Sequence, residues 1–133
     1  MRGNRAVVAV ALGGAAGAAA RYALGLAFGD RPGSFPWTTF AVNITGCLAL
    51  GVLVTGLVEL SAPHRLLRPA LGTGVLGGYT TFSTYAEQAR ALVANGRPGL
   101  AALYVLGTLV AALIAVRLGM LAVRAAVRLR RRQ

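Results

Sequence analysis

The sequence predicts an all-α membrane protein with four transmembrane helices, the third of which is broken near its middle. The chain has 133 residues, of which 56% are hydrophobic, and a mean hydropathy of +0.66. It is therefore too apolar for an ordinary soluble domain. Its apolar residues form four stretches of about 20 residues, the length that a bilayer requires. Glycines and hydroxyls interrupt the centre of the third stretch.

The first predicted span covers about residues 6–28. It contains a face of small residues, which lets helix backbones approach closely, built on Gly13, Gly14 and Gly17. Arg21 lies about two turns from the end of this span, an expensive place for a charge. Its side chain either snorkels to the headgroups or gives a water-filled vestibule a positive potential that gathers anions.

The second predicted span covers about residues 38–60, after a turn-rich loop that ends at Trp37, a suitable interfacial anchor. Asn43 lies in the early part of this span. An amide is costly to leave unpaired inside a membrane. Asn43 therefore either bonds a neighbouring helix, which is worth about 1 kcal/mol, or lines a pore.

The third predicted span, residues 69–93, contains the sequence GVLGGYTTFSTY at 74–85. We expect the helix to break at Gly77–Gly78, because each glycine lowers helix propensity by about 1 kcal/mol relative to alanine. A bilayer tolerates such a break only where the freed backbone faces protein, water or an ion. A broken helix near the midplane therefore points to an ion or substrate site.

The break is surrounded by hydroxyls, among them those of Thr81 and Ser83, and by two aromatic rings. Phe82 and Tyr85 are three residues apart and so share a helix face. They are either packing residues or present the positive edges of their rings to an anion.

The last predicted span covers about residues 100–123, and no linker is long enough to separate domains. We therefore expect one domain at 1–133. Tyr104 and Thr108 are four apart on this span. They either pack or form a short polar track.

The formal net charge of +11 would suggest nucleic acid as the partner of a soluble protein. Here most arginines lie at span ends, where they meet anionic headgroups, so we expect a lipid bilayer and no nucleic acid as partner. With both termini inside the cell, the inner ends carry nine arginines and the outer ends carry three, Arg31, Arg90 and Arg97. The nine are Arg2, Arg5, Arg65, Arg68, Arg124, Arg128 and Arg130–Arg132. The positive-inside rule therefore favours insertion with the termini inside.

Several function classes have no support in the sequence. There is no nucleophile–base pair, no metal-ligand spacing and no phosphate-binding loop, so we do not expect an enzyme. A small multidrug-type proton-coupled antiporter is the alternative to a channel, but it needs a carboxylate within the membrane. The three acidic residues, Asp30, Glu59 and Glu87, all fall near span ends or in loops. A membrane scaffold would explain the glycine faces but not the hydroxyl-rich break.

Three motifs resemble those of the Fluc (CrcB) fluoride channels. They are GGAAGAAARY at 13–22, VNITGCLALG at 42–51 and GVLGGYTTFSTYAE at 74–87. The resemblance covers essentially the whole chain, and the third motif is highly specific. It implies a multi-pass protein of the cell inner (plasma) membrane that exports fluoride passively.

The resemblance also implies an antiparallel, dual-topology dimer with two fluoride pores along its interface. The second subunit is either an identical chain or a related one inserted the opposite way. A structural sodium ion is implied at the dimer centre, held by the backbone carbonyls that match Gly77 and Thr80.

The family's pore residues match Asn43 and Phe82, and its second pore phenylalanine is replaced here by Tyr85. The hydroxyl of Tyr85 either donates to an anion or narrows the pore. Arg21 matches the family's arginine in the first motif, and Tyr104 and Thr108 match its polar track. Thr81 and Ser83 complete the predicted pore.

Overall fold

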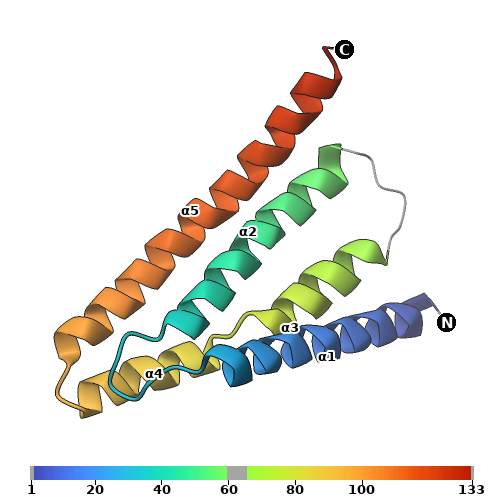
Figure 1. Ribbon diagram of the computed structural model, residues 1–133. Helices are drawn as coiled ribbons and strands as arrows, with labels where there is room; N and C mark the ends of the chain where they lie inside the picture. Colours follow the sequence, from blue (N-terminus) through green and yellow to red (C-terminus); the bar gives the residue numbers. More distant parts are fainter. Residues whose placement is uncertain (1, 60–65, 133) are drawn as a thin grey trace.

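The computed structural model describes residues 2–59 and 66–132, and every regular element in them is a helix (Figure 1). Three helices are long and apolar enough to cross a bilayer: α1 (Arg2–Phe28), α2 (Trp37–Glu59) and α5 (Pro98–Arg130). The third span is assembled from η1 (Pro69–Leu76), α3 (Gly77–Tyr79) and α4 (Ser83–Ala94). The predicted fold class of four helical spans, one of them broken, is confirmed.

The predicted bounds of the spans are close to those of the helices. The end of the second span, Leu60, lies outside the described residues, as does Arg65 of the arginine count. The largest difference is in α5, which continues seven residues past the predicted end at Val123. Its 33 residues extend about 50 Å, against about 30 Å for the hydrocarbon core. The helix can therefore continue beyond the membrane, because arginine is a good helix former.

The spans form two helix pairs that lie side by side. Figure 1 shows the order α5, α2, the third span and α1. Within this layer α2 packs mainly on α5, and α1 packs mainly on η1 and α3. Contacts between the pairs are sparser, and this is where the candidate site lies.

Glycines bring the backbones together in both pairs. In the first pair, a Cβ atom on Gly17 would overlap the carbonyl oxygen of Val75, and one on Gly78 would overlap that of Gly14. The predicted small-residue face of α1 therefore meets the third span directly. In the second pair, a Cβ atom on Gly51 or Gly119 would overlap a backbone carbonyl of the partner helix.

The third span departs from the sequence prediction in two ways. It begins with a π-helix, in which the amide of Gly77 donates to the carbonyl of Gly72, five residues earlier. The break then follows the glycine pair instead of coinciding with it: Gly77–Tyr79 is helical, and Thr80 is extended, with φ −76° and ψ 161°. The reason is that Gly78 serves the close approach to α1, which needs a helical backbone without a side chain.

Candidate functional site

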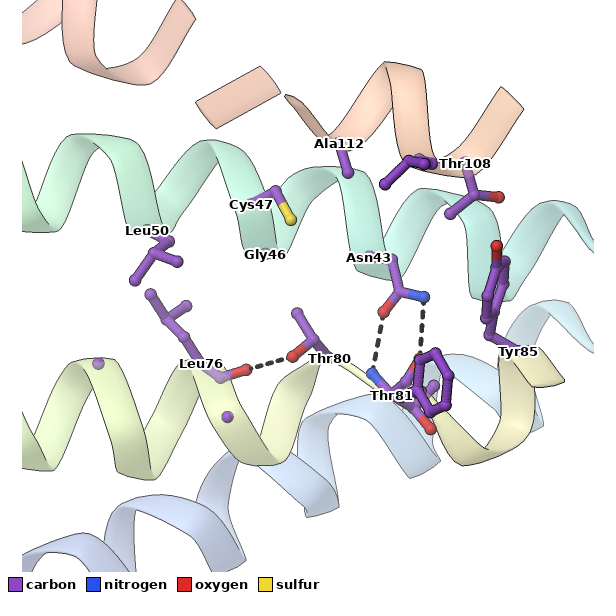
Figure 2. Close-up of a pocket in the computed structure, with 14 residues that line it drawn as sticks. Asn43, Gly46, Cys47, Leu50, Leu76, Thr80, Thr81, Tyr85, Thr108 and Ala112 are labelled. Atoms are coloured by element: carbon purple, nitrogen blue, oxygen red, sulfur yellow. Dashed lines mark hydrogen bonds between the residues drawn. The ribbon is translucent and has the colours of Figure 1, made fainter. Parts of the chain in front are cut away.

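The unwound stretch between α3 and α4 is held in place by Asn43 on α2. The side-chain amide nitrogen of Asn43 donates to the carbonyl of Thr81 (3.0 Å), and the Thr81 amide donates to its side-chain oxygen (2.9 Å). Figure 2 shows both bonds spanning the gap between the helix pairs. Asn43 therefore replaces the helical partners that Thr81 loses at the break. Its amide nitrogen also carries a second N–H, which no hydrogen bond between described residues uses.

Most carbonyls around the break have partners. That of Leu76 accepts from both the amide and the hydroxyl of Thr80 (3.0 and 2.9 Å). That of Gly78 accepts from Nε of Arg21 (3.2 Å). Within residues 2–59 and 66–132, no hydrogen bond reaches the carbonyls of Gly77, Tyr79 and Thr80. The break thus leaves a small group of oxygen atoms available to a ligand.

A cavity of about 560 Å³ lies between the two helix pairs at the break. It is lined by elements of both pairs, and none of its lining residues, all in the described part of the chain, is charged. Seven of the ten predicted site residues line it: Asn43, Gly77, Thr80, Thr81, Phe82, Tyr85 and Thr108. The structure therefore brings together most of the residues that the sequence predicted for the site.

The two aromatic rings at the cavity are neighbours, but only Tyr85 is held by a hydrogen bond, whereas Phe82 is largely exposed. The ring centroids of Phe82 and Tyr85 are 5.9 Å apart. Phe82 lines the cavity yet is 79% exposed, so the cavity is an open groove of the single chain. The hydroxyl of Tyr85 donates to the carbonyl of Val105 on α5 (2.9 Å). In this structure that hydroxyl is therefore bound to protein. The ring is held at one end by the backbone of α4 and at the other by this hydrogen bond.

The remaining predicted residues lie around the groove at different depths. Thr108 is buried, and its hydroxyl has no partner among the described residues. Tyr104 is fully buried behind Tyr85 and donates its hydroxyl to Gln88 (3.0 Å). Ser83 is exposed at the start of α4, with its hydroxyl 3.4 Å from that of Thr81. Ser83 and Tyr104 do not line the cavity of the single chain.

Arg21 lines a second cavity, which shares Thr81 with the groove. A small cavity of about 50 Å³ is lined by Arg21, Val42 and four threonines, Thr38, Thr39, Thr81 and Thr84. Thr81 lines both this cavity and the larger one. With its Nε atom bound to Gly78, the guanidinium is anchored to the break, and it brings a positive charge to a pocket of hydroxyls.

The sequence analysis missed seven residues of the groove wall, three of them on α2 and two each on η1 and α5. Gly46, Cys47 and Leu50 follow Asn43 at spacings of three, four and seven residues and line the same cavity. That spacing marks one helix face, so the signal was present. Gly46 has a specific use, because a Cβ atom there would overlap the methyl group of Thr80.

Comparison with known proteins places these features in a family. The family model described as "CrcB-like protein, Camphor Resistance (CrcB)" matches residues 8–120. The chain belongs to the CrcB-like family.

Several relatives carry the name "Fluoride-specific ion channel". The FluC 1 protein of Streptomyces coelicolor is 52% identical over 118 residues, which cover 89% of this chain and 77% of the relative. FluC 2 of Nocardia farcinica is 48% identical, covering 85% and 81%. FluC 1 of Mycolicibacterium paratuberculosis is 46% identical, covering 96% of each protein.

The resemblance drawn from the three sequence motifs is thus confirmed. As a CrcB-like protein with four spans, the chain is a multi-pass protein of the plasma membrane. Its relatives are named as channels and not as enzymes, in agreement with the sequence prediction.

Proposed function

We propose that this CrcB-like chain is one subunit of a passive, fluoride-selective channel that exports fluoride from the cell. The observation that carries the proposal is the groove at the helix break, which combines amide, hydroxyl and ring-edge donors and contains no acidic residue. The names of the relatives support the same ion.

Fluoride is small and strongly hydrated, so its pathway must replace water with donors. Asn43 offers its second amide N–H, and Thr108 offers a hydroxyl without a protein partner. Phe82 and Tyr85 offer the positive edges of their rings. The membrane potential alone drives the export, since a negative interior moves one anion outward with about 2.3 kcal/mol per 100 mV.

A second subunit, packed antiparallel, completes the pathway in this proposal. The groove of the single chain leaves the ring of Phe82 79% exposed, so a second subunit can cover it. Two antiparallel copies would bring their grooves together and form two pores along the interface. Thr81 and Ser83 then take their place along the pores, whereas Tyr104 is fully buried and supports Tyr85 from behind.

A structural sodium ion at the centre of the dimer fits the break. Hard cations prefer oxygen ligands, and the carbonyl oxygens of Gly77 and Thr80 both lie at the groove without partners among the described residues. Two such oxygens from each subunit would supply four ligands. When bound, the ion offsets the partial negative charge of these carbonyls.

Arg21 forms an anion vestibule behind the break. The small cavity at its guanidinium is walled by threonine hydroxyls, so both charge and donors favour an anion there. Since Thr81 lines this cavity and the groove, an anion leaving the vestibule reaches the Asn43–Thr81 pair first.

Fluoride efflux from liposomes that contain the purified protein tests the proposed function. The wild type should release fluoride without a proton gradient, and a requirement for such a gradient would instead support the antiporter.

Phe82→Ile should leave the dimer folded but reduce efflux severely, because the ring edge is lost while bulk is roughly kept. Phe28→Ile is the matched control, since Phe28 is also highly exposed but lies away from the groove. Unchanged efflux in dimeric Phe82→Ile would remove Phe82 from the pore.

Replacement of sodium by a large organic cation tests the central ion. Efflux should fall after long incubation, and it should recover when sodium is restored. Gly78→Ala should increase this dependence, because a Cβ atom there would overlap the carbonyl of Gly14 and displace the segment that carries both ligand carbonyls. Gly77→Ala is the control, since its Cβ atom would lie 3.9 Å from the Gly72 carbonyl and meet nothing closer. Efflux indifferent to sodium, together with no density for an ion in a dimer structure, would refute the sodium site.

The second subunit is either identical or a related chain inserted the opposite way. The count of nine inner against three outer arginines favours one orientation, and hence a related partner in the cell. Single cysteines at Ser34 and at Gln133, introduced after Cys47→Ala, report the orientation through labelling of intact cells. Labelling mainly at Ser34 supports the related partner, and equal labelling of both sites supports a homodimer of dual topology.

A further inference from the structure

Asp30, near the start of the loop between α1 and α2, begins a hydrogen-bond chain that leads to the groove. One of its carboxylate oxygens accepts from the amide of Thr38 (2.8 Å), and the other accepts from the amide and the hydroxyl of Thr39 (3.3 Å each). These donors belong to the first turn of α2, where a negative charge is favourable. The carboxylate is therefore fixed to the helix that carries Asn43.

The chain continues through Gln88 on α4 to Tyr104 on α5. The amide nitrogen of Gln88 donates to Asp30 (3.2 Å), and its amide oxygen accepts from the hydroxyl of Tyr104 (3.0 Å). An ionised carboxylate can only accept hydrogen bonds, so Asp30 requires the nitrogen of Gln88 to face it. The oxygen of Gln88 must then face Tyr104.

Tyr104 connects the hydrogen-bond chain to the aromatic pair, Phe82 and Tyr85, because its ring contacts that of Tyr85. It is 0% exposed, and its ring centroid lies 5.2 Å from that of Tyr85. On its other side it contacts Phe35 of the loop at 5.3 Å. Tyr85 in turn contacts Phe82. The loop, two helices and the pore aromatics are thus connected by an unbroken series of contacts.

We infer that Asp30 and Gln88 are positioning residues for the pore aromatics, acting through Tyr104. The inference rests on the proposed fluoride conduction. Buried polar networks hold one arrangement when every member is satisfied, and here the side-chain amide of Gln88 both donates and accepts. On α4, Gln88 supplies the polar contact to Tyr104, and Tyr85 supplies the ring contact. Loss of any member lets the Tyr104 ring move, and with it the ring of Tyr85 on the groove wall.

A double-mutant cycle on fluoride efflux tests this coupling. Gln88→Leu and Tyr104→Phe should each lower efflux about fivefold, the factor that corresponds to one net hydrogen bond. The double variant should lose no more than either single variant, because each change already breaks the same link. Independent effects would multiply to about 25-fold, and that result would overturn the inference.

Arg97→Gln is the matched control at the same loop. The guanidinium of Arg97 donates to the carbonyl of Gly33 but has no bond to Gln88 or Tyr104. The variant loosens the loop without touching the chain of bonds, so efflux should remain at the wild-type rate. A loss as large as that of Gln88→Leu would mean that general loosening of the loop is the cause, which would also overturn the inference.

A polarity exchange separates positioning from simple stability. Gln88→Glu alone opposes two carboxylates and should lower efflux at least as much as Gln88→Leu. Combined with Asp30→Asn, it restores a donor and an acceptor between positions 30 and 88 at unchanged net charge. The new amide nitrogen of position 30 faces the Thr39 amide, so efflux should recover in part, to above that of Gln88→Glu alone. No recovery, in protein verified as dimeric, would count against the inference. Absence of efflux from the wild type would instead overturn the proposed function.

Discussion

Both helix pairs are packed closely at glycines, but only one of them contains an unwound helix. Both α1 with the third span and α2 with α5 cross at glycines whose missing side chains let backbones touch. In the second pair the helices remain regular, so their backbone groups are satisfied within each helix. In the first pair the third span unwinds, and its carbonyls need partners from elsewhere. Close packing at glycines is therefore compatible with both a regular and an unwound helix. The pairs differ in the groups that bond the backbone at the break.

The partners of the break come largely from side chains of other helices. Asn43 on α2 serves Thr81, and Arg21 on α1 serves Gly78. Regular helices thus act as the scaffold that holds an irregular segment open. A membrane interior permits such a segment only under this condition.

The largest expected effect comes from breaking the bridge between the pairs. Asn43→Leu leaves the amide and the carbonyl of Thr81 unpaired, which should cost about 2–5 kcal/mol of stability and abolish efflux. Thermal unfolding of the purified protein, followed by size-exclusion chromatography, measures the first effect. Thr55→Val is the control on the same helix, because the buried Thr55 hydroxyl has no partner among the described residues and so no hydrogen bond is lost. A loss of stability no greater than that of the control would show that Asn43 does not support the break.

The next effect compares the glycine crossings themselves. Gly17→Ala and Gly51→Ala both place a methyl group onto a carbonyl, which should cost about 1–3 kcal/mol. Gly25→Ala meets no atom within 4 Å and should be neutral or stabilising by up to about 1 kcal/mol. Only Gly17→Ala should also change the dependence of efflux on sodium, since it displaces Val75 and Tyr79 beside the break. An equal change in Gly51→Ala would mean that the pairs do not differ in this way.

The sequence predicted most of the architecture because its signals are local. Apolar length identifies the spans, glycines at 13–17 mark a close crossing, and the cluster of hydroxyls near Phe82 marks the irregular segment. The π-helix of η1 was not predictable, since it is a change of hydrogen-bond register that no residue type requires. The exact position of the break also depended on tertiary contact: Gly78 stays helical because it packs on Gly14.

The residues of the site could be predicted from the sequence, but the hydrogen bonds between them could not. Spacing and motif resemblance nominated Asn43, Tyr85 and Tyr104, yet their partners lie 16 to 38 residues away in the chain. Sequence periodicity carries no information on such distant contacts. The role of Gln88 was missed for the same reason, because nothing in its neighbourhood marks it as a link between Asp30 and Tyr104.

A smaller effect separates the charge of Arg21 from its hydrogen bond. Arg21→Gln retains a donor for Gly78 but removes the charge, so efflux should fall severalfold at low ionic strength. The difference from the wild type should shrink as salt rises, because screening shortens the reach of the charge. Arg21→Leu should in addition lose about 1 kcal/mol of stability with the donor. A deficit of Arg21→Gln that does not change with salt would contradict a vestibule charge and leave only the role at the break.

The smallest effect concerns the hydroxyl that distinguishes Tyr85 from phenylalanine. It donates to the carbonyl of Val105, an oxygen that the regular helix α5 already supplies with an amide donor. Tyr85→Phe should therefore cost at most about 1 kcal/mol of stability, leave the ring edge at the groove and preserve or raise efflux. Tyr79→Phe is the control, since its hydroxyl contacts Thr45 and its side chain does not line the groove. If Tyr85→Phe instead lost most of its fluoride efflux while Tyr79→Phe did not, the hydroxyl would have to leave Val105 and donate to the anion. Tyr85 would then serve the pathway through its hydroxyl as well as its ring edge.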